Sequence, residues 1–169
     1  RGLGYDVEGD VGPIRTWRDL ADTRLLGHIG LADPSKSGSI NKCFEMLVQR
    51  EMQDRMAALS GELASGAVTQ AQGLDVSWAE AMTLIKQIGG NAAYLTFSAS
   101  QVPVDTARGQ IAAGMSIDFY GRSQAEWEER HVGRKTMVYH TPDAGSSVSA
   151  DPIGLFRGAP NAERAKMFI

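Results

Sequence analysis

The chain has 169 residues, of which 43% are hydrophobic and 22% are charged, and its formal net charge is −3. These values are typical of one globular domain that buries a hydrophobic core. The negative net charge argues against a nucleic-acid surface as the main role. No apolar run approaches the roughly 20 residues that a membrane-spanning helix needs. Cys43 is the single cysteine, which excludes an internal disulfide.

Apolar runs alternate with helical patterns along the chain. The first part of the chain predicts a helix at 17–21 capped by Thr16, a strand at 28–32, a helix from 40 to 59 and a loop or ragged helix end at 61–73. Next come a helix that is capped by Asp75 or Ser77 and stops at 89–90, a strand at 93–97, and a helix marked by Val104, Ala107 and Ile111. The last part predicts a strand at 115–119, a helix at 124–130, a strand at 136–140 and a last helix opened by Pro160. This alternation predicts an α/β fold, with a mostly parallel sheet covered by helices on both faces in a three-layer α/β/α arrangement.

Polar clusters follow three of the predicted strands. Ligands of open α/β sheets bind beyond the carboxyl ends of the strands, so parallel strands would bring these clusters to one edge. We therefore predict a ligand-binding site there. Its candidate residues are Ser37, Gly38, Ser39, Ser98, Ser100, Gln101, Asp118 and Tyr120.

The loop 33–39 leads from the first predicted strand into the long helix. A helix N-terminus presents unpaired backbone N–H groups and roughly half a positive charge, which suits an anion. Gly38 lets the backbone approach a ligand, and Ser37 and Ser39 can cap the helix or donate hydroxyls. Lys36 and Lys42 add positive charge at the same end. An ordinary helix-capping turn is the alternative interpretation of this loop.

Catalytic signatures are sparse. There is no phosphate loop and no GxGxxG motif. The run 114–118 approaches the GxSxG pattern of a nucleophile elbow, but Asp118 replaces the last glycine, and we interpret Ser116 as a strand side chain. We interpret Asp118 as a ligand contact or a turn cap rather than a base, while Tyr120 can bind a ligand or pack its ring.

Four short motifs occur in order along the chain. They are Thr16-Trp17-Arg18-Asp19-Leu20, then Ile29-Gly30-Leu31-Ala32-Asp33-Pro34 with Ser37-Gly38-Ser39, then Gly109-Gln110 through Ile117-Asp118-Phe119-Tyr120, and finally Gly154-Leu155-Phe156-Arg157-Gly158-Ala159-Pro160-Asn161 with Ala165-Lys166-Met167-Phe168-Ile169. As an ordered set they resemble the periplasmic solute-binding proteins of bacterial ABC importers, of the ferric-iron-binding kind. The resemblance covers nearly the whole chain.

That resemblance implies a two-lobed, type II periplasmic-binding-protein-like fold with the ligand held between the lobes. Residues 1–9 would be a hinge or extended segment, 10–143 the second α/β lobe, and 144–169 a crossover strand and the start of a return to the first lobe. The first lobe would otherwise be absent, so we interpret the chain as a fragment of a longer protein.

The resemblance also implies what is bound. In iron-binding relatives two adjacent tyrosines hold the metal, and here the pair is Phe119-Tyr120, which leaves Tyr120 as the metal-ligand position. The serine loop matches the place where such proteins hold an anion. We therefore expect an anionic solute or a metal chelate, with ferric ion or an anion as the transported ligand and no cofactor.

The resemblance implies that the partner is the membrane permease of an ABC importer and that the location is periplasmic, with no nucleic acid and no enzymatic activity. Two other functions stay open at this point. One is an α/β enzyme domain, such as a hydrolase or transferase, and the other is the effector-sensing domain of a transcription regulator.

Overall fold

A computed structural model describes residues 13–133, 136–143, 145–148 and 153–169. Its elements are the 3-10 helices η1 (Trp17–Ala21) and η2 (Thr23–Leu25), the strands β1 (Ile29–Ala32), β2 (Ala92–Thr96) and β3 (Ala113–Gly114), and the α-helices α2 (Gly38–Ala58), α3 (Ser60–Ser65), α4 (Gln70–Gly90), α5 (Gln101–Ala107), α6 (Asp118–Val132) and α7 (Ala162–Phe168). The predicted extended segment at 1–9 lies outside the described residues.

The three strands form one parallel sheet in the order β2-β1-β3. The central strand β1 pairs with both neighbours, so that Ile29 lies opposite Ala92 on one side and Ala113 on the other. All four residues of β1 are buried, as expected of a parallel strand covered on both faces. The predicted parallel sheet and α/β fold are confirmed.

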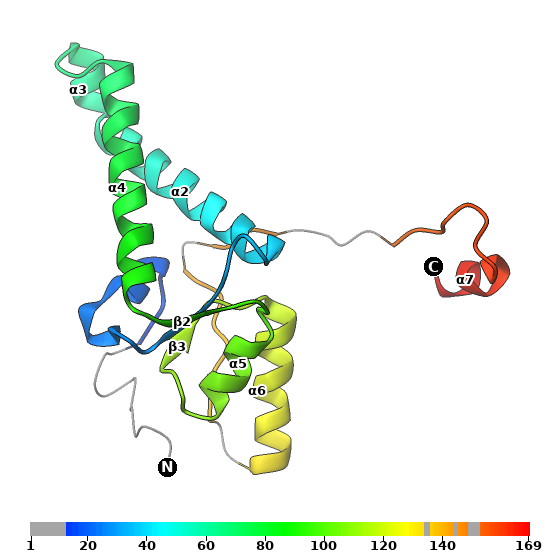
Figure 1. The fold of residues 1–169 in the computed structure, drawn as a ribbon. Coiled ribbons are helices and arrows are strands. Elements are labelled where there is room, and N and C mark those ends of the chain that lie inside the picture. The colour runs from blue at the N-terminus through cyan, green and yellow to red at the C-terminus, as the bar shows by residue number, and fades with distance from the viewer. Residues whose placement is uncertain (1–12, 134–135, 144, 149–152) are drawn as a thin grey trace.

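Helices cover the sheet on opposite sides. In Figure 1, α2 and α4 rise from one side of the sheet, and α5 and α6 lie together on the other. Apolar residues of β1, α2 and α4 share one buried cluster, which includes Leu31, Ile40, Leu47, Leu84 and Ile88. The predicted apolar stripe of the helix at 40–59 is confirmed at Ile40 and Leu47, both almost fully buried.

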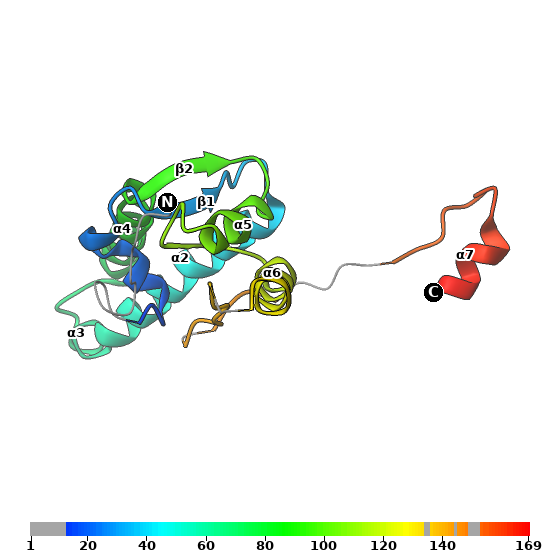
Figure 2. The same ribbon diagram turned by 90° about the horizontal axis from the view of Figure 1, so that it is seen from below.

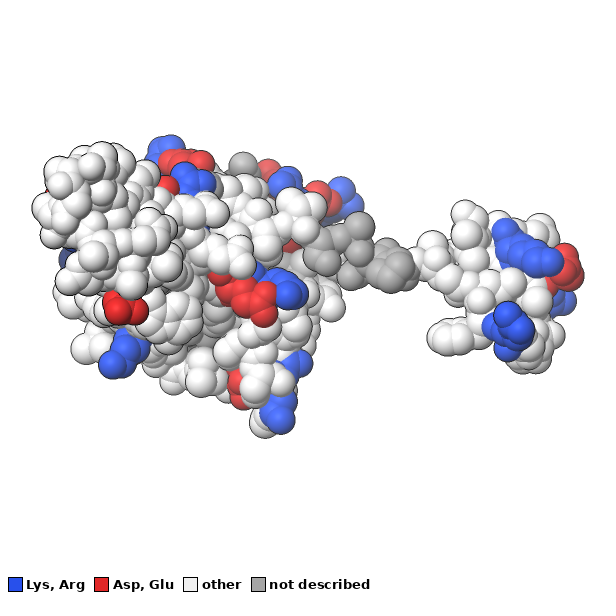
Figure 3. All heavy atoms as spheres, turned by 90° about the horizontal axis from the view of Figure 1, so that it is seen from above, with Lys and Arg blue, Asp and Glu red and all other residues white. Residues whose placement is uncertain are grey.

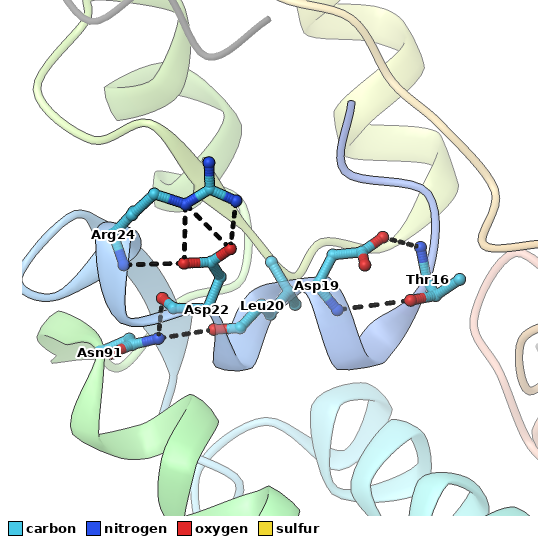
Figure 4. Close-up of polar contacts among 6 residues, drawn as sticks. All are labelled: Thr16, Asp19, Leu20, Asp22, Arg24 and Asn91. Carbon is cyan, nitrogen blue, oxygen red and sulfur yellow. Dashed lines mark hydrogen bonds and ion pairs between the residues drawn. The ribbon is translucent and has the colours of Figure 1, made fainter. Parts of the chain in front are cut away.

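Asn91 joins several segments at the amino-terminal end of the sheet (Figure 4). Its side-chain amide donates to the carbonyls of Leu20 (2.9 Å) and Asp22 (2.7 Å). Its own carbonyl accepts from the backbone N–H of Gly27 (3.0 Å) and Ile29 (3.3 Å). One buried residue at the start of β2 therefore fixes both η1 and the start of β1.

Two helix starts are set by capping boxes. Thr16 caps η1, with Asp19 as its reciprocal partner, which confirms the predicted cap. Thr69 caps α4, and the Gln72 side chain accepts a hydrogen bond from the backbone N–H of Thr69. The predicted caps at Asp75 or Ser77 were wrong, because this box starts the helix earlier and places both residues inside it. The region predicted as a loop or ragged helix end at 61–73 holds most of α3 and the first residues of α4.

The strand predicted at 115–119 was wrong. The β3 ladder stops at Gly114, the partner of Gly30, and Asp118 begins α6 instead. A Cβ on Gly114 would lie 2.5 Å from the carbonyl oxygen of Gly30, so the strands approach closely there. Met115 is buried after this contact. The β-forming residues after Gly114 have no further strand residues to pair with, so the chain enters helix α6 instead. The predicted helix at 124–130 is the later part of α6.

The strand predicted at 136–140 is also absent, and the described residues of 144–169 contain no crossover strand. Strands need a neighbouring ladder, and these segments have none among the described residues. Two hydrogen bonds instead tie the residues that follow 136–140 to η1 and the chain just before it: Asp143 N–H donates to the Arg15 carbonyl (3.0 Å), and Trp17 Nε1 donates to the Gly145 carbonyl (3.0 Å). The last helix, α7, begins at Ala162 rather than Pro160 and stands apart from the other elements in Figure 2.

Charges of both signs are mixed on the surface. Helix α2 contains two such ion pairs, Lys42–Glu45 and Arg50–Asp54. Acidic and basic side chains lie side by side on the face shown in Figure 3. Within the described residues, none of the helices combines the length and apolar character that crossing a membrane requires.

Candidate functional site

Three loops meet at the carboxyl-terminal edge of the sheet, which we call the loop edge. They are 33–37 between β1 and α2, 97–100 between β2 and α5, and 115–117 between β3 and α6. Because the three strands are parallel, their carboxyl ends share this edge. Figures 1 and 2 show α2, α5 and α6 all beginning there. The structure thus places all the predicted site residues on one edge.

The turn before α2 is built from Asp33. The Asp33 carbonyl accepts from the N–H groups of Lys36 and Ser37, both at 2.9 Å, and its carboxylate accepts from Ser35 N–H at 2.8 Å. Hydrogen bonds from the Ser35 side chain and backbone hold the pKa of Asp33 below its ordinary value. Ser37 then caps α2, since its Oγ accepts from Ile40 N–H at 3.5 Å.

The next two N–H groups of α2 face no protein acceptor. Among the described residues, none accepts a hydrogen bond from the backbone of Gly38 or Ser39. Both residues are exposed, and a Cβ on Gly38 would meet nothing within 4 Å. Open N–H groups at the start of a 21-residue helix are the geometry in which an anion binds.

The two lysines near this turn differ. Lys42 Nζ lies 2.6 Å from the Glu45 carboxylate, whose other oxygen accepts from Asn41 at 2.7 Å. These contacts, the Lys42 hydrogen bond above all, lower the pKa of Glu45. The charge of Lys42 is therefore largely offset by Glu45. Lys36 is exposed and close enough to Asp33 to stabilise its carboxylate. Lys36 therefore supplies positive charge at this turn.

The second cluster is organised by Asp105, a residue that the sequence analysis missed. Ser98 Oγ and Ser100 Oγ are hydrogen bonded at 2.7 Å. Gln101 Nε2 donates to Asp105 Oδ1 at 2.7 Å, and Tyr94 OH donates to Asp105 Oδ2 at 2.6 Å. Burial, followed by the hydrogen bond to Asp105, raises the pKa of Tyr94. Gln101 was predicted in a polar turn, but the structure begins α5 there. With the helix started at Gln101, its four-residue spacing to Asp105 was a signal that could have found this pair.

The third cluster lies in the first turn of α6 rather than at a strand end. Asp118 Oδ1 accepts from Phe119 N–H at 2.8 Å, and the Arg122 side chain lies 3.9 Å from Asp118. Asp118 is therefore the first residue of α6, with Ile117 at the N-cap position and no side-chain cap hydrogen bond. The cap role considered for Asp118 is not confirmed, and its role as a ligand contact stays a prediction. The rings of Phe119 and Tyr120 are tilted, with centroids 5.5 Å apart, and 67% and 38% of the two residues are exposed.

Groups that could carry other chemistry are engaged elsewhere. The Ser116 hydroxyl donates to the Ile117 carbonyl at 3.2 Å. His131 Nδ1 contacts the Trp127 carbonyl at 2.8 Å, and His140 pairs with Asp143 at 3.3 Å. Across the described ranges, no group of three or more His, Cys, Asp or Glu residues could hold a metal ion.

A separate pocket of about 150 Å³ lies among η1, α5 and the segment 137–146. Arg15, Thr106, Ser116 and His140 are among its polar lining residues, and apolar side chains provide most of its wall. Its lining includes none of the predicted ligand-binding residues, but Met115 and Ser116 of the third loop belong to it, so the pocket adjoins the loop edge at that loop.

The chain is similar to a curated protein and to a solved structure, and no family model matches it. An uncharacterized protein of Haemophilus influenzae is 24% identical over 155 residues, covering 92% of this chain and 36% of that protein. The solved structure of the periplasmic binding protein AfuA from Actinobacillus pleuropneumoniae, with exogenous fructose-6-phosphate bound, superposes with a TM-score of 0.60 at 22% identity. That match covers 92% of this chain and 39% of AfuA.

The fold is therefore that of a periplasmic binding protein, shared over most of the described chain. The chain spans well under half the length of both proteins that it matches, 36% of one and 39% of the other. The match establishes the arrangement of the elements. The ligand and partners follow below as a proposal.

Proposed function

We propose that the chain is part of the solute-binding receptor of a bacterial ABC importer, located in the periplasm, and that its loop edge holds an anionic solute. The observation that carries this proposal is the pair of open N–H groups on Gly38 and Ser39. They lie at the start of a long helix, on the edge where two further polar clusters lie. The AfuA fold supports the same function class.

The ligand in this proposal is a phosphate-bearing solute. Phosphoryl oxygens accept several hydrogen bonds, which the backbone of Gly38 and Ser39 and the Ser39 hydroxyl can donate. Lys36 adds a positive charge beside them. AfuA was solved with fructose-6-phosphate, which makes a phosphate ester the natural first probe.

Ferric ion fits these residues less well. Tyr120 offers one phenol, and Phe119 beside it offers no donor atom. An anion needs only the N–H and hydroxyl donors that the α2 turn supplies, so the proposal is for an anionic cargo.

The partners follow from the receptor role. The first lobe would close over the loop edge and complete the site, and the membrane permease of the importer would receive the solute. This chain by itself supplies one wall of the cleft, so it binds phosphate ligands weakly, with dissociation constants of about 1 mM or higher.

A charge placed at the α2 turn tests the site directly. Ser39→Asp puts a carboxylate at the second helical position of α2, where it complements the helix dipole and competes with a bound anion. Ala71→Asp is the matched control, because Ala71 holds the same position in α4. Binding is measured by NMR chemical-shift titration of the chain with inorganic phosphate and with fructose-6-phosphate.

We expect saturable shifts at Gly38 and Ser39 in the unsubstituted chain and in Ala71→Asp. Ser39→Asp should weaken binding at least tenfold while its thermal stability stays equal or rises slightly. Equal affinity in Ser39→Asp and Ala71→Asp would place the anion elsewhere and overturn the assigned site. No saturable response to either ligand in the unsubstituted chain would overturn the proposed function.

A further inference from the structure

Asp105 is a buried carboxylate directly behind the loop edge. It lies on α5, is 5% exposed, and has both oxygens occupied: Oδ1 by Gln101 Nε2 (2.7 Å) and Oδ2 by the Tyr94 hydroxyl (2.6 Å). Its two partners come from different elements, α5 and β2. A buried carboxylate is retained at low cost only when it is fully hydrogen bonded, as it is here.

The carboxylate decides which way round the Gln101 amide lies. An ionised carboxylate accepts hydrogen bonds and cannot donate them, so only the Nε2 side of the amide can face Asp105. Turning the amide over would bring Oε1 against a carboxylate oxygen. Gln101 is exposed, and its Oε1 is the acceptor that remains for a ligand at the edge.

The space around the Tyr94 hydroxyl allows it to bond the second oxygen of Asp105. A Cβ on Gly30 would lie 2.9 Å from this hydroxyl and 2.4 Å from Ile111 Cδ1. Glycine on the central strand therefore leaves room for Tyr94 to reach Asp105. Asp105 thus lies between Tyr94 of β2 and Gln101 of α5, in space that Gly30 of β1 leaves open, and its bond to Gln101 is the one that sets the orientation of the exposed amide.

We propose that Asp105 is a positioning residue that presents Gln101 Oε1 as a fixed acceptor, so that the loop edge selects an anionic solute carrying a hydroxyl group. This inference rests on the proposed function. The phosphoryl group takes the N–H donors of Gly38 and Ser39, and a hydroxyl of the same ligand donates to Gln101 Oε1. The hydroxyl pair Ser98–Ser100 lies on the preceding loop as a further polar neighbour. Inorganic phosphate lacks the second group.

The test compares two ligands across four forms of the chain. Fructose-6-phosphate carries hydroxyls and inorganic phosphate serves as the anion alone. The ratio of their affinities is measured by NMR titration in the unsubstituted chain, Asp105→Asn, Gln101→Ala and Tyr94→Phe. Asp105→Asn lets the amide turn over, Gln101→Ala removes it, and Tyr94→Phe leaves the Gln101–Asp105 bond in place.

We expect fructose-6-phosphate to bind more tightly than phosphate by roughly three- to tenfold, the value of one hydroxyl hydrogen bond. Asp105→Asn and Gln101→Ala should remove most of that preference while phosphate affinity stays within twofold, and Tyr94→Phe should keep it. The exposed Gln101→Ala variant preserves the test if Asp105→Asn fails to fold.

A second readout needs no ligand. The two side-chain amide protons of Gln101, assigned through their loss in Gln101→Ala, should give separated resonances with one proton protected from exchange. Asp105→Asn should abolish that protection. Intact ligand preference in both Asp105→Asn and Gln101→Ala, with normal phosphate binding, overturns the positioning role alone. Absence of phosphate binding in the unsubstituted chain overturns the proposed function together with this inference.

Discussion

The two ends of the small sheet differ in whether their polar groups are paired within the protein. At the amino-terminal end, Asn91 is 5% exposed and its side chain and carbonyl bind η1, η2 and the start of β1. At the loop edge, the N–H groups of Gly38 and Ser39 have no acceptor among the described residues. One end satisfies its backbone internally, and the other leaves donors open to solvent.

This contrast separates stability from binding. Buried polar groups that are fully paired fix one arrangement of the chain, and removing a partner leaves costly unsatisfied atoms. Exposed donors at a helix start cost little when they are hydrated, and they remain available to a ligand. We therefore expect substitutions at Asn91 to affect folding and substitutions at Gly38 or Ser39 to affect binding.

The largest expected effect is at Asn91. Asn91→Ala removes both amide hydrogen bonds and leaves the carbonyls of Leu20 and Asp22 without this donor. We expect a loss of about 2–4 kcal/mol in the free energy of unfolding, measured by urea denaturation. Asn41→Ala is the control: Asn41 bonds one exposed glutamate and should cost about 0.5 kcal/mol or less. Similar losses for both variants would mean that the amino-terminal end is not the more strongly fixed one.

A smaller effect distinguishes two neighbouring serines at the loop edge. Ser37 caps α2 through its Oγ, so Ser37→Ala should lower the free energy of unfolding by about 0.5–1 kcal/mol. Ser39 is exposed and has no cap bond, so Ser39→Ala should leave stability nearly unchanged while it weakens phosphate binding. Urea denaturation and NMR titration of the two variants test this division. A stability loss in Ser39→Ala as large as that in Ser37→Ala would contradict it.

The sequence predicted the loop edge better than the details within it. Strands followed by polar turns were enough to gather Ser37, Ser98 and Asp118 on one edge, because parallel pairing places carboxyl ends together. The helical start at Asp118 was missed, since β-forming residues such as Ile117 and Phe119 outweighed the helix-start signal of an aspartate. Asp105 was missed because Gln101 was assigned to a polar cluster after a strand, so its four-residue spacing to Asp105 on one helix was not recognised.

The smallest effect concerns pH at the amino-terminal end. The Arg24 side chain and backbone bind Asp22 and lower the pKa of its carboxyl from its ordinary value of 3.8 to about 2. The folded state therefore favours ionised Asp22. Its contribution to stability is complete well above pH 3.8 and is lost as the pH falls toward 2. Arg24 Nη2 lies 2.6 Å from Asp22 Oδ2, which supplies the contact.

An NMR titration of the Asp22 carboxyl carbon measures this shift, with Arg24→Gln as the comparison. We expect a midpoint near 2 in the unsubstituted chain and a clearly higher midpoint in Arg24→Gln. Asp22→Asn should also lose less stability than the unsubstituted chain between pH 4.5 and 2. An unsubstituted midpoint near 4 would show that solvent breaks the Asp22–Arg24 contact. The fixed character of the amino-terminal end would then rest on the buried bonds of Asn91 alone, because an exposed ion pair is worth little unless its geometry is held.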